Sequence, residues 1–246
     1  MARQPQVRRR SSRTARQLAS RARPPVDLRY LLDPTIVAQG PRPLCVAFAV
    51  GLGHEAGRTL AGTPQRPVAP EAIWWYCTQR GQTSDRGMLL LDSGPAIADV
   101  GQPALTLWPY NDQLGVGTEE PPAQAGPMPW NTATLREIRL AHDGVEVELE
   151  DMLADGKPVV LIVEVTDEFD NPDDEGHVTV PNVRANPGDY HAVICIGAAT
   201  HPTLGRRLLI RNSWGDYWGA GGYCWLPVTY LIAFATQAAV VELGAT

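Results

Sequence analysis

The 246-residue sequence lacks any apolar run near the roughly 20 residues that a membrane-spanning helix needs. Its charged N-terminus is also not followed by the apolar stretch of about 7–15 residues that a secretory signal peptide contains. These absences predict a protein with no membrane contact that stays in the cytoplasm. The composition, 44% hydrophobic and 20% charged, is typical of a globular protein with one large domain or two lobes.

Cysteine is scarce, and its spacing excludes several kinds of site. The chain has four cysteines, at Cys45, Cys77, Cys195 and Cys224. They form no CxxC pair and no Cys/His ligand spacing, so we expect no zinc site, no other metal and no cofactor. Four thiols in a chain of this length do not form a disulfide scaffold, which agrees with a reducing cytoplasm.

The first 24 positions contain no acidic residue and few apolar residues. Eight arginines lie there: Arg3, Arg8, Arg9, Arg10, Arg13, Arg16, Arg21 and Arg23. This composition predicts a disordered basic arm over residues 1–24, and the alternative is an organelle transit peptide, which is also rich in Arg and Ser and poor in acidic residues. Residues 25–246 then carry 13 basic and 27 acidic side chains, a net charge of −14. Such a body does not suit nucleic acid. The basic arm is expected to bind either an anionic partner or the acidic residues 25–246 of the same chain. Composition does not decide between these two partners.

The secondary-structure signals change in character along the chain. A run of small and apolar residues at 45–60 predicts a buried helix, and a second helix should begin near Pro70, since proline suits the first turn. The later runs "VVLIVEV", "HAVICIGAA", "RLLIRNSW" and "FATQAAVVEL" predict strands bounded by Gly, Pro and Asn. The sequence therefore predicts an α+β protein with a helical lobe at about 35–130 and a β-rich lobe at about 131–240.

Cys45 has two interpretations. Free cysteine is often buried, so Cys45 can be an inert core thiol, as we expect for Cys77 on the second helix. However, Cys45 begins the predicted helix, where the positive end of the helix dipole lowers the pKa of a thiol. Gln39 lies six residues earlier, and its amide can donate a hydrogen bond to a developing oxyanion.

Two further motifs carry polar groups at the ends of predicted strands. His191 begins the apolar run "HAVICIG", a position that a structural histidine also occupies. Asn212 ends the run "LLIRN" and is followed by Trp214 and a glycine-rich turn. Asparagine in this place can orient a histidine ring, and the tryptophan can shield that hydrogen bond from water. The alternative is a plain turn with aromatic packing.

Together, "QGPRPLCVAF", "HAVICIG" and "RNSWGDYWGAGGY" resemble the three signature segments of the papain-like cysteine peptidases. The order Cys, His, Asn matches. His191 lies 146 residues after Cys45, inside the window of about 130–150 for this arrangement, and Asn212, 167 residues after Cys45, lies slightly beyond it. The segments "WPY", "GKPVV" and "LPVTYL" are similar to those of compact prokaryotic members. The resemblance covers residues 25–246, which we expect to form one peptidase domain.

The resemblance implies a two-lobe fold, with a helical left lobe, a β-barrel-like right lobe and the active-site cleft between them. It implies that Cys45 is the nucleophile, paired as a thiolate with a His191 imidazolium that Asn212 orients. Gln39 and the backbone N–H of Cys45 would form the oxyanion hole, with Trp214 as a supporting residue. The implied activity is hydrolysis of a peptide or protein substrate through a thioester.

The sequence also departs from the family pattern. Arg42 stands where the family has a disulfide-forming cysteine, so that bridge cannot form. Pro43 and Leu44 are expected to add bulk where the substrate backbone passes. Gly87 is a weak match for the glycine that pairs with the substrate backbone, and an ordinary loop glycine is the alternative.

Two other functions remain open at this stage. A deamidase or an acyl-transferase would use the same triad and the same thioester. A non-catalytic peptide-binding module would retain the fold without turnover. The presence of Cys45, His191, Asn212 and Gln39 together argues against a silent binder, which does not need all four.

Overall fold

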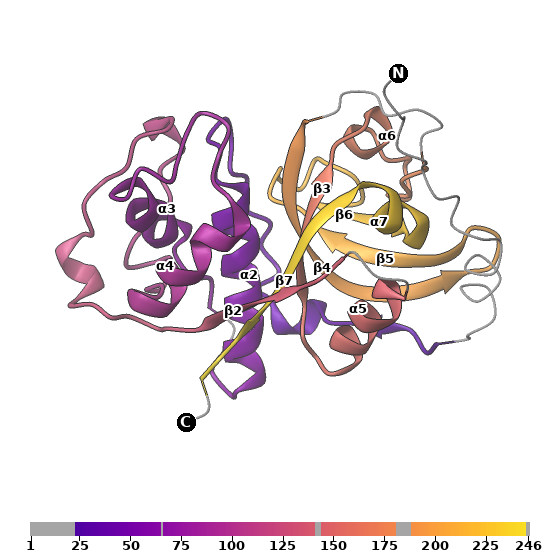
Figure 1. Ribbon diagram of the computed structural model, residues 1–246, viewed down its shortest axis with the longest axis horizontal. Helices are drawn as coiled ribbons and strands as arrows, with labels where there is room; N and C mark the ends of the chain where they lie inside the picture. The colour runs from indigo at the N-terminus through magenta and orange to yellow at the C-terminus, as the bar shows by residue number, and fades with distance from the viewer. Residues whose placement is uncertain (1–22, 65, 141–143, 181–187, 245–246) are drawn as a thin grey trace, which may run out of the picture.

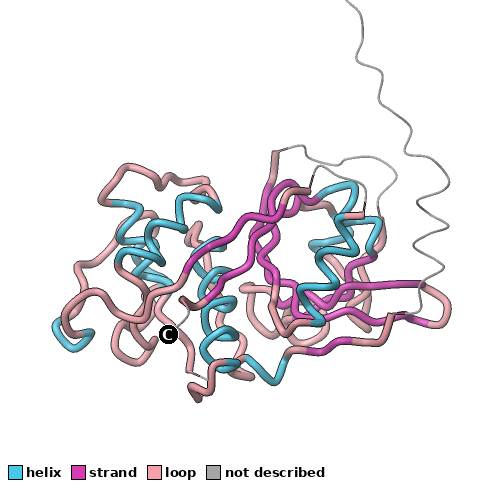
Figure 2. Tube along the Cα trace, turned by 60° about the horizontal axis from the view of Figure 1, so that its bottom comes forward, coloured by secondary structure: helices cyan, strands magenta, loops and turns pink. Residues whose placement is uncertain are grey.

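The computed structural model describes residues 23–64, 66–140, 144–180 and 188–244. The predicted basic arm falls almost entirely on residues 1–22, outside this description. Within the described part of the chain, helices dominate before residue 130 and strands after it. The helical half lies on the left of Figure 1 and most of the sheet on the right, and Figure 2 shows the same separation from another side.

The helical half is built around α2. This helix spans Cys45–Leu60, and it is followed by α3 (Pro70–Thr78) and α4 (Ser93–Asp99). The first residue of α3 is Pro70, as the sequence predicts. Short 3-10 turns lie in the connecting segments: η1 (Arg29–Leu31) before α2, η2 (Leu90–Asp92) between α3 and α4, and η3 (Asp112–Leu114) and η4 (Ala123–Ala125) between α4 and the sheet strand that follows.

Small residues let α2 lie close to the rest of the molecule. A Cβ atom on Gly53 would be 3.0 Å from Cγ2 of Val241, and one on Gly51 would be 3.3 Å from Nε2 of Gln102. The two glycines weaken the helix by about 1 kcal/mol each relative to alanine. The close approach that they permit explains their presence, and it presses α2 between the two halves of the fold (Figure 1).

The sheet contains seven antiparallel strands in the order β2-β7-β3-β4-β5-β6, and β1 pairs with β4. The strands span Val26–Asp27 (β1), Thr134–Ile138 (β2), Val159–Glu164 (β3), Tyr190–His201 (β4), Gly205–Arg211 (β5), Tyr223–Pro227 (β6) and Ala235–Glu242 (β7). Three helices lie between these strands on the chain: α5 (Val145–Ala154) after β2, α6 (Asp167–Asp170) after β3 and α7 (Val228–Phe234) after β6. All residues of β3 are buried, as expected for a strand covered on both faces.

The barrel-like right lobe predicted from the family resemblance is wrong in one respect, because the sheet stays open. The two edge strands, β2 and β6, do not pair with each other. The edge of β6 is instead covered by a short segment: the Val178 N–H donates to the Trp225 carbonyl (3.1 Å), and the Trp225 N–H donates to the Gly176 carbonyl (2.8 Å). These hydrogen bonds pair the backbone N–H and C=O of Trp225 at the edge of β6, which a neighbouring strand would pair in a closed barrel.

No helix among the described residues is long and apolar enough to cross a membrane. The described cysteines, which are all four of the chain, are free thiols. Burial raises the pKa of Cys77 and of Cys195 to about 12 each, and it also raises the pKa of Cys224. These three thiols are buried, whereas Cys45 is partly exposed. Cys45 is therefore the thiol that a reagent or a substrate meets first.

A buried histidine on α2 makes the stability depend on pH. His54 is fully buried, and its Nδ1 lies 3.1 Å from Oε1 of Gln102. Burial lowers the pKa of His54 to about 4, so the folded state holds this ring neutral at a pH where the unfolded chain binds a proton. Because the unfolded state then binds more protons, the free energy of unfolding falls as the pH drops from about 6.5 towards 4.

We expect the variant His54→Gln to lose part of this pH dependence. Glutamine cannot take up a proton, so the slope of the unfolding free energy between pH 6 and pH 5 should decrease by about 1.2 kcal/mol per pH unit relative to the unsubstituted protein. Denaturant unfolding at several pH values measures the slope. Equal slopes for His54→Gln and the unsubstituted protein would contradict the prediction.

Candidate active site

A pocket of about 320 Å³ lies where the start of α2 meets the start of β4. Such a volume is at the lower end of the range for small-ligand and substrate pockets. Cys45 from α2 and His191 from β4 both line it. The other lining residues are Val46, Arg86, Met88, Leu89, Leu90, Ile162, Tyr190, Ala192, Thr236 and Gln237. Two of the predicted site residues, 146 positions apart in the sequence, therefore share one cavity.

Cys45 occupies the first position of α2 because the preceding turn ends the irregular lead-in there. The Leu44 N–H donates to the Arg42 carbonyl (2.9 Å), and the Leu44 carbonyl accepts the Phe48 N–H (3.0 Å), which starts the helix. The sulfur lies within reach of three backbone N–H groups, those of Ala192, Val46 and Cys45 itself. The Ala192 contact brings the thiol against the strand residue next to His191.

Burial disfavours the charged forms of both Cys45 and His191. Burial raises the pKa of the Cys45 thiol, and the three backbone N–H groups only partly offset this effect. Burial also lowers the pKa of His191 to about 4, against the opposing hydrogen bond from Asn212. Each shift favours the neutral form when the group is considered alone. A thiolate–imidazolium pair in this pocket would therefore require that the mutual attraction of the two charges outweigh both burial effects.

The contact between His191 and Asn212 determines which ring nitrogen can act as a base. Oδ1 of Asn212 accepts the backbone N–H of Ser213 at 2.8 Å, and a backbone N–H can only donate. The same oxygen lies 2.7 Å from Nε2 of His191, so Nε2 carries the proton in the neutral ring. The lone pair is then on Nδ1. Asn212 thus holds His191 in the tautomer that leaves Nδ1 free to accept a proton from the thiol.

An aromatic cluster surrounds the His191–Asn212 contact. The Trp214 ring lies over the His191 ring, with centroids 4.5 Å apart and an interplanar angle of 32°. Phe169 contacts Trp214 edge-on at 5.7 Å and His191 at 6.4 Å, and Trp218 packs on Phe169 at 5.3 Å. These rings exclude water from a polar pair that is itself only 6% and 2% exposed, which strengthens the hydrogen bond.

Gln39 lies beside this pair but is not part of the pocket lining. Its N–H donates to the Ser213 carbonyl at 2.8 Å, and its side-chain Oε1 accepts the Ser213 hydroxyl at 2.6 Å. The side-chain Nε2 donates to the Arg42 carbonyl at 2.8 Å. An amide nitrogen carries two hydrogens, so one remains for an oxyanion.

The lead-in to Cys45 differs from expectation. Leu44 is fully buried in the core, so the prediction that it adds bulk to the cleft is wrong. The helix geometry directs this side chain inward, and only Pro43 stays partly exposed. Gly87 lies next to Pro43, since a Cβ on Gly87 would be 3.1 Å from the Pro43 carbonyl oxygen. The Gly87 N–H and carbonyl already pair with Ser84 (3.1 and 2.9 Å), which favours the turn interpretation of this glycine.

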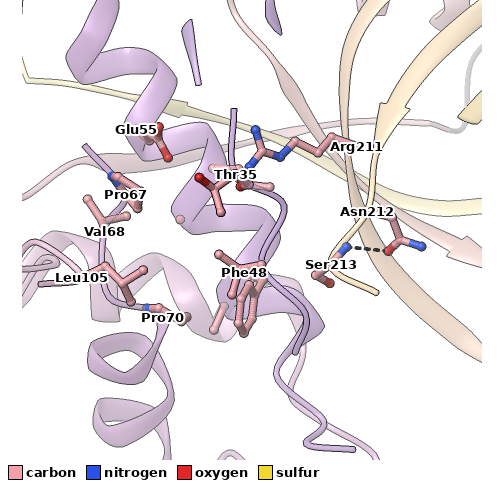
Figure 3. Close-up of a pocket in the computed structure, with 14 residues that line it drawn as sticks. Thr35, Phe48, Glu55, Pro67, Val68, Pro70, Leu105, Arg211, Asn212 and Ser213 are labelled. Carbon is pink, nitrogen blue, oxygen red and sulfur yellow. Dashed lines mark hydrogen bonds between the residues drawn. The ribbon is translucent and has the colours of Figure 1, made fainter. Parts of the chain in front are cut away.

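A second cavity contacts Asn212 and Ser213 from another side, between α2 and residues 67–70 (Figure 3). Its volume of about 40 Å³ suits a few water molecules at most. Glu55 and Arg211 provide its charged groups, and the Arg211 guanidinium donates to the Asp33 and Thr35 carbonyls (2.6 Å each). Neither Cys45 nor His191 lines it. The 320 Å³ pocket is therefore the candidate site.

Among the described residues, Glu175, His177 and His201 form the one group whose ligand atoms approach within 4.8 Å of one another, as a metal site requires. A metal on Nε2 of His201 would require the proton on Nδ1. However, Nδ1 already accepts the backbone N–H groups of Thr203 (3.2 Å) and Leu204 (3.1 Å). The ring is therefore set for hydrogen bonding, and we assign no metal to the group.

Some residues at the site have no signal in the sequence that identifies them. Phe169 stands in the acidic run "DEFDNPDDE", where an isolated aromatic residue is the only hint of a buried position. The apolar pocket residues Met88, Leu89 and Leu90 lie in a loop-rich region without periodicity. Ser213 is part of a recognised segment, but its contact with Gln39 depends on the tertiary structure.

The known proteins that this chain matches in sequence are cysteine proteases. The family model described as "Papain family cysteine protease" matches residues 103–235, which is just over half of the chain. A cathepsin L-like proteinase of Fasciola hepatica is 29% identical over 116 residues. That match covers 46% of this chain but only 29% of the Fasciola protein. The chain therefore matches less than a third of the length of this curated relative.

Solved structures resemble nearly the whole chain. Xylellain, a cysteine protease from Xylella fastidiosa, has a TM-score of 0.71 at 24% identity, covering 93% of this chain and 89% of its own. Digestive procathepsin L 3 of Tenebrio molitor larval midgut has a TM-score of 0.72 at 19% identity, covering 92% and 73%. Bromelain from Ananas comosus, solved in complex with the E64 inhibitor, has a TM-score of 0.67 at 15% identity, covering 89% and 99%. These likenesses establish the fold.

Proposed function

Because the chain belongs to the papain family of cysteine proteases, we propose that it hydrolyses peptide bonds with Cys45 as the nucleophile. The observation that carries the proposal is the shared pocket of Cys45 and His191, with His191 held at 2.7 Å by Asn212. A nucleophile, a base and a residue that orients the base are the parts that acyl transfer needs.

In the first half of the reaction, the Cys45 proton moves to Nδ1 of His191 and the sulfur attacks the substrate carbonyl carbon. The carbonyl π electrons move to its oxygen, which becomes the oxyanion. The remaining N–H of the Gln39 amide and the backbone N–H of Cys45 stabilise this charge. As the oxyanion collapses, the C–N bond breaks and His191 gives its proton to the leaving amine, which leaves a thioester.

In the second half, water attacks the thioester carbon and gives its proton to Nδ1 of His191. The C–S bond then breaks, the carboxylic acid leaves, and the proton returns to the sulfur. Throughout, Nε2–H of His191 stays on Asn212, whose amide oxygen also stabilises the imidazolium. Trp214 keeps water from this hydrogen bond by covering the ring.

The pocket walls favour a substrate with an apolar side chain beside the cleaved bond. The apolar part of the wall comes from Val46, Met88, Leu89, Leu90, Ile162 and Ala192, and polar groups are added by Arg86, Tyr190, Thr236 and Gln237. Burying one large aliphatic side chain is worth about 1.5–3 kcal/mol, so such a peptide should be preferred by about 10-fold or more over one with glycine in that position.

Digestion of a peptide library in H₂¹⁸O tests the proposal and separates its alternatives. Hydrolysis gives shorter peptides whose new carboxyl groups contain one ¹⁸O, with an apolar residue enriched near the cut. Deamidation would leave the peptides at full length with a mass gain on glutamine or asparagine, and acyl transfer would give ligated products. Binding without any product would overturn the enzymatic function.

A further inference from the structure

The strongest feature outside the triad is a fully buried arginine just before the nucleophile. Arg42 is 0% exposed, and its guanidinium uses all five of its N–H donors. Two of them contact the carboxylate of Glu71 on α3. The other three donate to carbonyls of one loop: those of Gly115 (2.9 Å), Asn111 (2.7 Å) and Gly117 (3.0 Å).

This arrangement has a physical cause. A charge as deeply buried as Arg42 is tolerated only with a paired counter-charge and satisfied hydrogen bonds. Glu71 is 1% exposed and lies in the first turn of α3, where the helix dipole also favours a negative charge. The bidentate contact has the fork geometry that lysine cannot reproduce. Arg42 therefore links α3, the loop at residues 111–117 and the turn before Cys45.

The main chain of Arg42 faces the catalytic groups. Its carbonyl accepts Nε2 of Gln39 (2.8 Å) and the N–H of Leu44 (2.9 Å), the residue before Cys45. Tyr110 reinforces the same turn, because its hydroxyl donates to the Gln39 carbonyl (2.5 Å) and its ring lies 5.2 Å from the Arg42 guanidinium carbon. The side chain of Arg42 thus fixes the carbonyl that aims the Gln39 amide.

We propose that Arg42 is a positioning residue of the active site. Its buried guanidinium holds the turn at residues 39–45 rigid, so that the Gln39 amide and the Cys45 N–H converge on one oxyanion without a covalent cross-link. This inference rests on the proposed function, since it concerns the oxyanion formed during attack by Cys45. It extends that function to a residue that touches neither substrate nor sulfur.

The test compares the double variant Arg42→Met/Glu71→Leu with Arg42→Lys. Replacing both charges by apolar residues of similar size avoids the uncompensated buried carboxylate that Arg42→Met alone would leave, and such replacements often fold well. Turnover of a peptide substrate by the double variant should fall about 100-fold in kcat, the size expected for a misplaced oxyanion donor, with KM within about 3-fold. Arg42→Lys keeps the positive charge but cannot make the bidentate contact of a guanidinium. Its kcat should lie between those of the unsubstituted protein and the double variant.

Two further measurements distinguish positioning from stability. The control Arg207→Met removes another buried arginine, which donates to the carbonyls of Val178 and Trp225 (2.9 Å each) and does not line the pocket of Cys45. It should lower the melting temperature and leave kcat unchanged. Adding Gln39→Ala should lower kcat strongly in the unsubstituted protein, but less than about 3-fold in the double variant, because the amide is already misplaced there.

Binding of a peptidyl aldehyde separates this inference from the proposed function. The Cys45 sulfur adds to the aldehyde carbon, the thiol proton passes to the oxygen, and that oxygen occupies the oxyanion position without any turnover. If peptides are not cleaved but the aldehyde binds about 100-fold more weakly to the double variant, the proposed hydrolysis fails and the role of Arg42 stands. Unchanged kcat and aldehyde affinity in the folded double variant, or an equal loss from Gln39→Ala in both backgrounds, would overturn that role.

Discussion

Replacing Cys45 by serine should abolish peptide hydrolysis, with kcat reduced by about 10⁴- to 10⁶-fold, the scale seen when a member of a catalytic triad is removed. A serine hydroxyl at this position has nearly the volume of the thiol, so the pocket and the fold should persist. It holds its proton far more tightly, however, and a His191 whose pKa burial lowers to about 4 is a weak base for it. The loss should therefore appear in the chemistry and not in substrate binding.

The measurement is single-turnover hydrolysis of a fluorogenic peptide with an apolar residue next to the cleaved bond. The matched control is Cys77→Ala, which removes a buried thiol that lies on α3 and contacts the Asp92 carbonyl (3.5 Å). The control should keep its activity per folded molecule. If Cys45→Ser retained more than about a tenth of the activity, a role for Cys45 as the nucleophile would be untenable.

The second large effect is expected for His191→Ala. Without the ring, the thiol has no acceptor for its proton, and its burial keeps its pKa above the usual range of a cysteine. We expect kcat to fall by about 10⁴-fold or more, and a double variant that also contains Cys45→Ser to lose little beyond either single variant, since the two residues act as a unit.

The pH dependence of Cys45 alkylation gives a signature that a merely structural histidine would not produce. In the unsubstituted protein, the attraction between thiolate and imidazolium should make the rate of reaction with iodoacetamide high already at neutral pH. In His191→Ala, the rate should rise only at alkaline pH, above the usual titration range of a thiol, because burial then acts alone. The control His177→Gln changes a histidine outside the pocket and should leave the profile unaltered. Identical profiles for His191→Ala and the unsubstituted protein would contradict the ion pair.

Local patterns predicted the parts of the fold in which sequence and burial agree. The start of α3 at Pro70 follows from the fixed backbone angle of proline. The run "VVLIVEV" predicts a strand, and β3 is buried along its full length. The open sheet could not be predicted in this way, because closure depends on whether the edges of β2 and β6 meet, and no short pattern encodes that distance.

The candidate site could also be predicted from the sequence only in part. The resemblance of the segments around Cys45, His191 and Asn212 to the papain-like signature predicted a shared site, and the structure joins His191 to Asn212 and places Cys45 in the same pocket. The direction of the Leu44 side chain could not be predicted, because it depends on the helix phase set at Cys45. The partners of Arg42 were also out of reach, since Glu71 lies 29 residues away and the carbonyls of Gly115 and Gly117 more than 70.

Covalent labelling with a thiol-directed peptidyl epoxide shows whether Cys45 is a thiol activated by His191. The epoxide is mixed with the protein at neutral pH, and the adduct is located by mass spectrometry of the digested chain. We expect a single adduct on Cys45 in the unsubstituted protein and none on Cys45 in His191→Ala over the same time. Slow and equal labelling of Cys45, Cys77 and Cys195, unchanged by His191→Ala, would contradict this expectation.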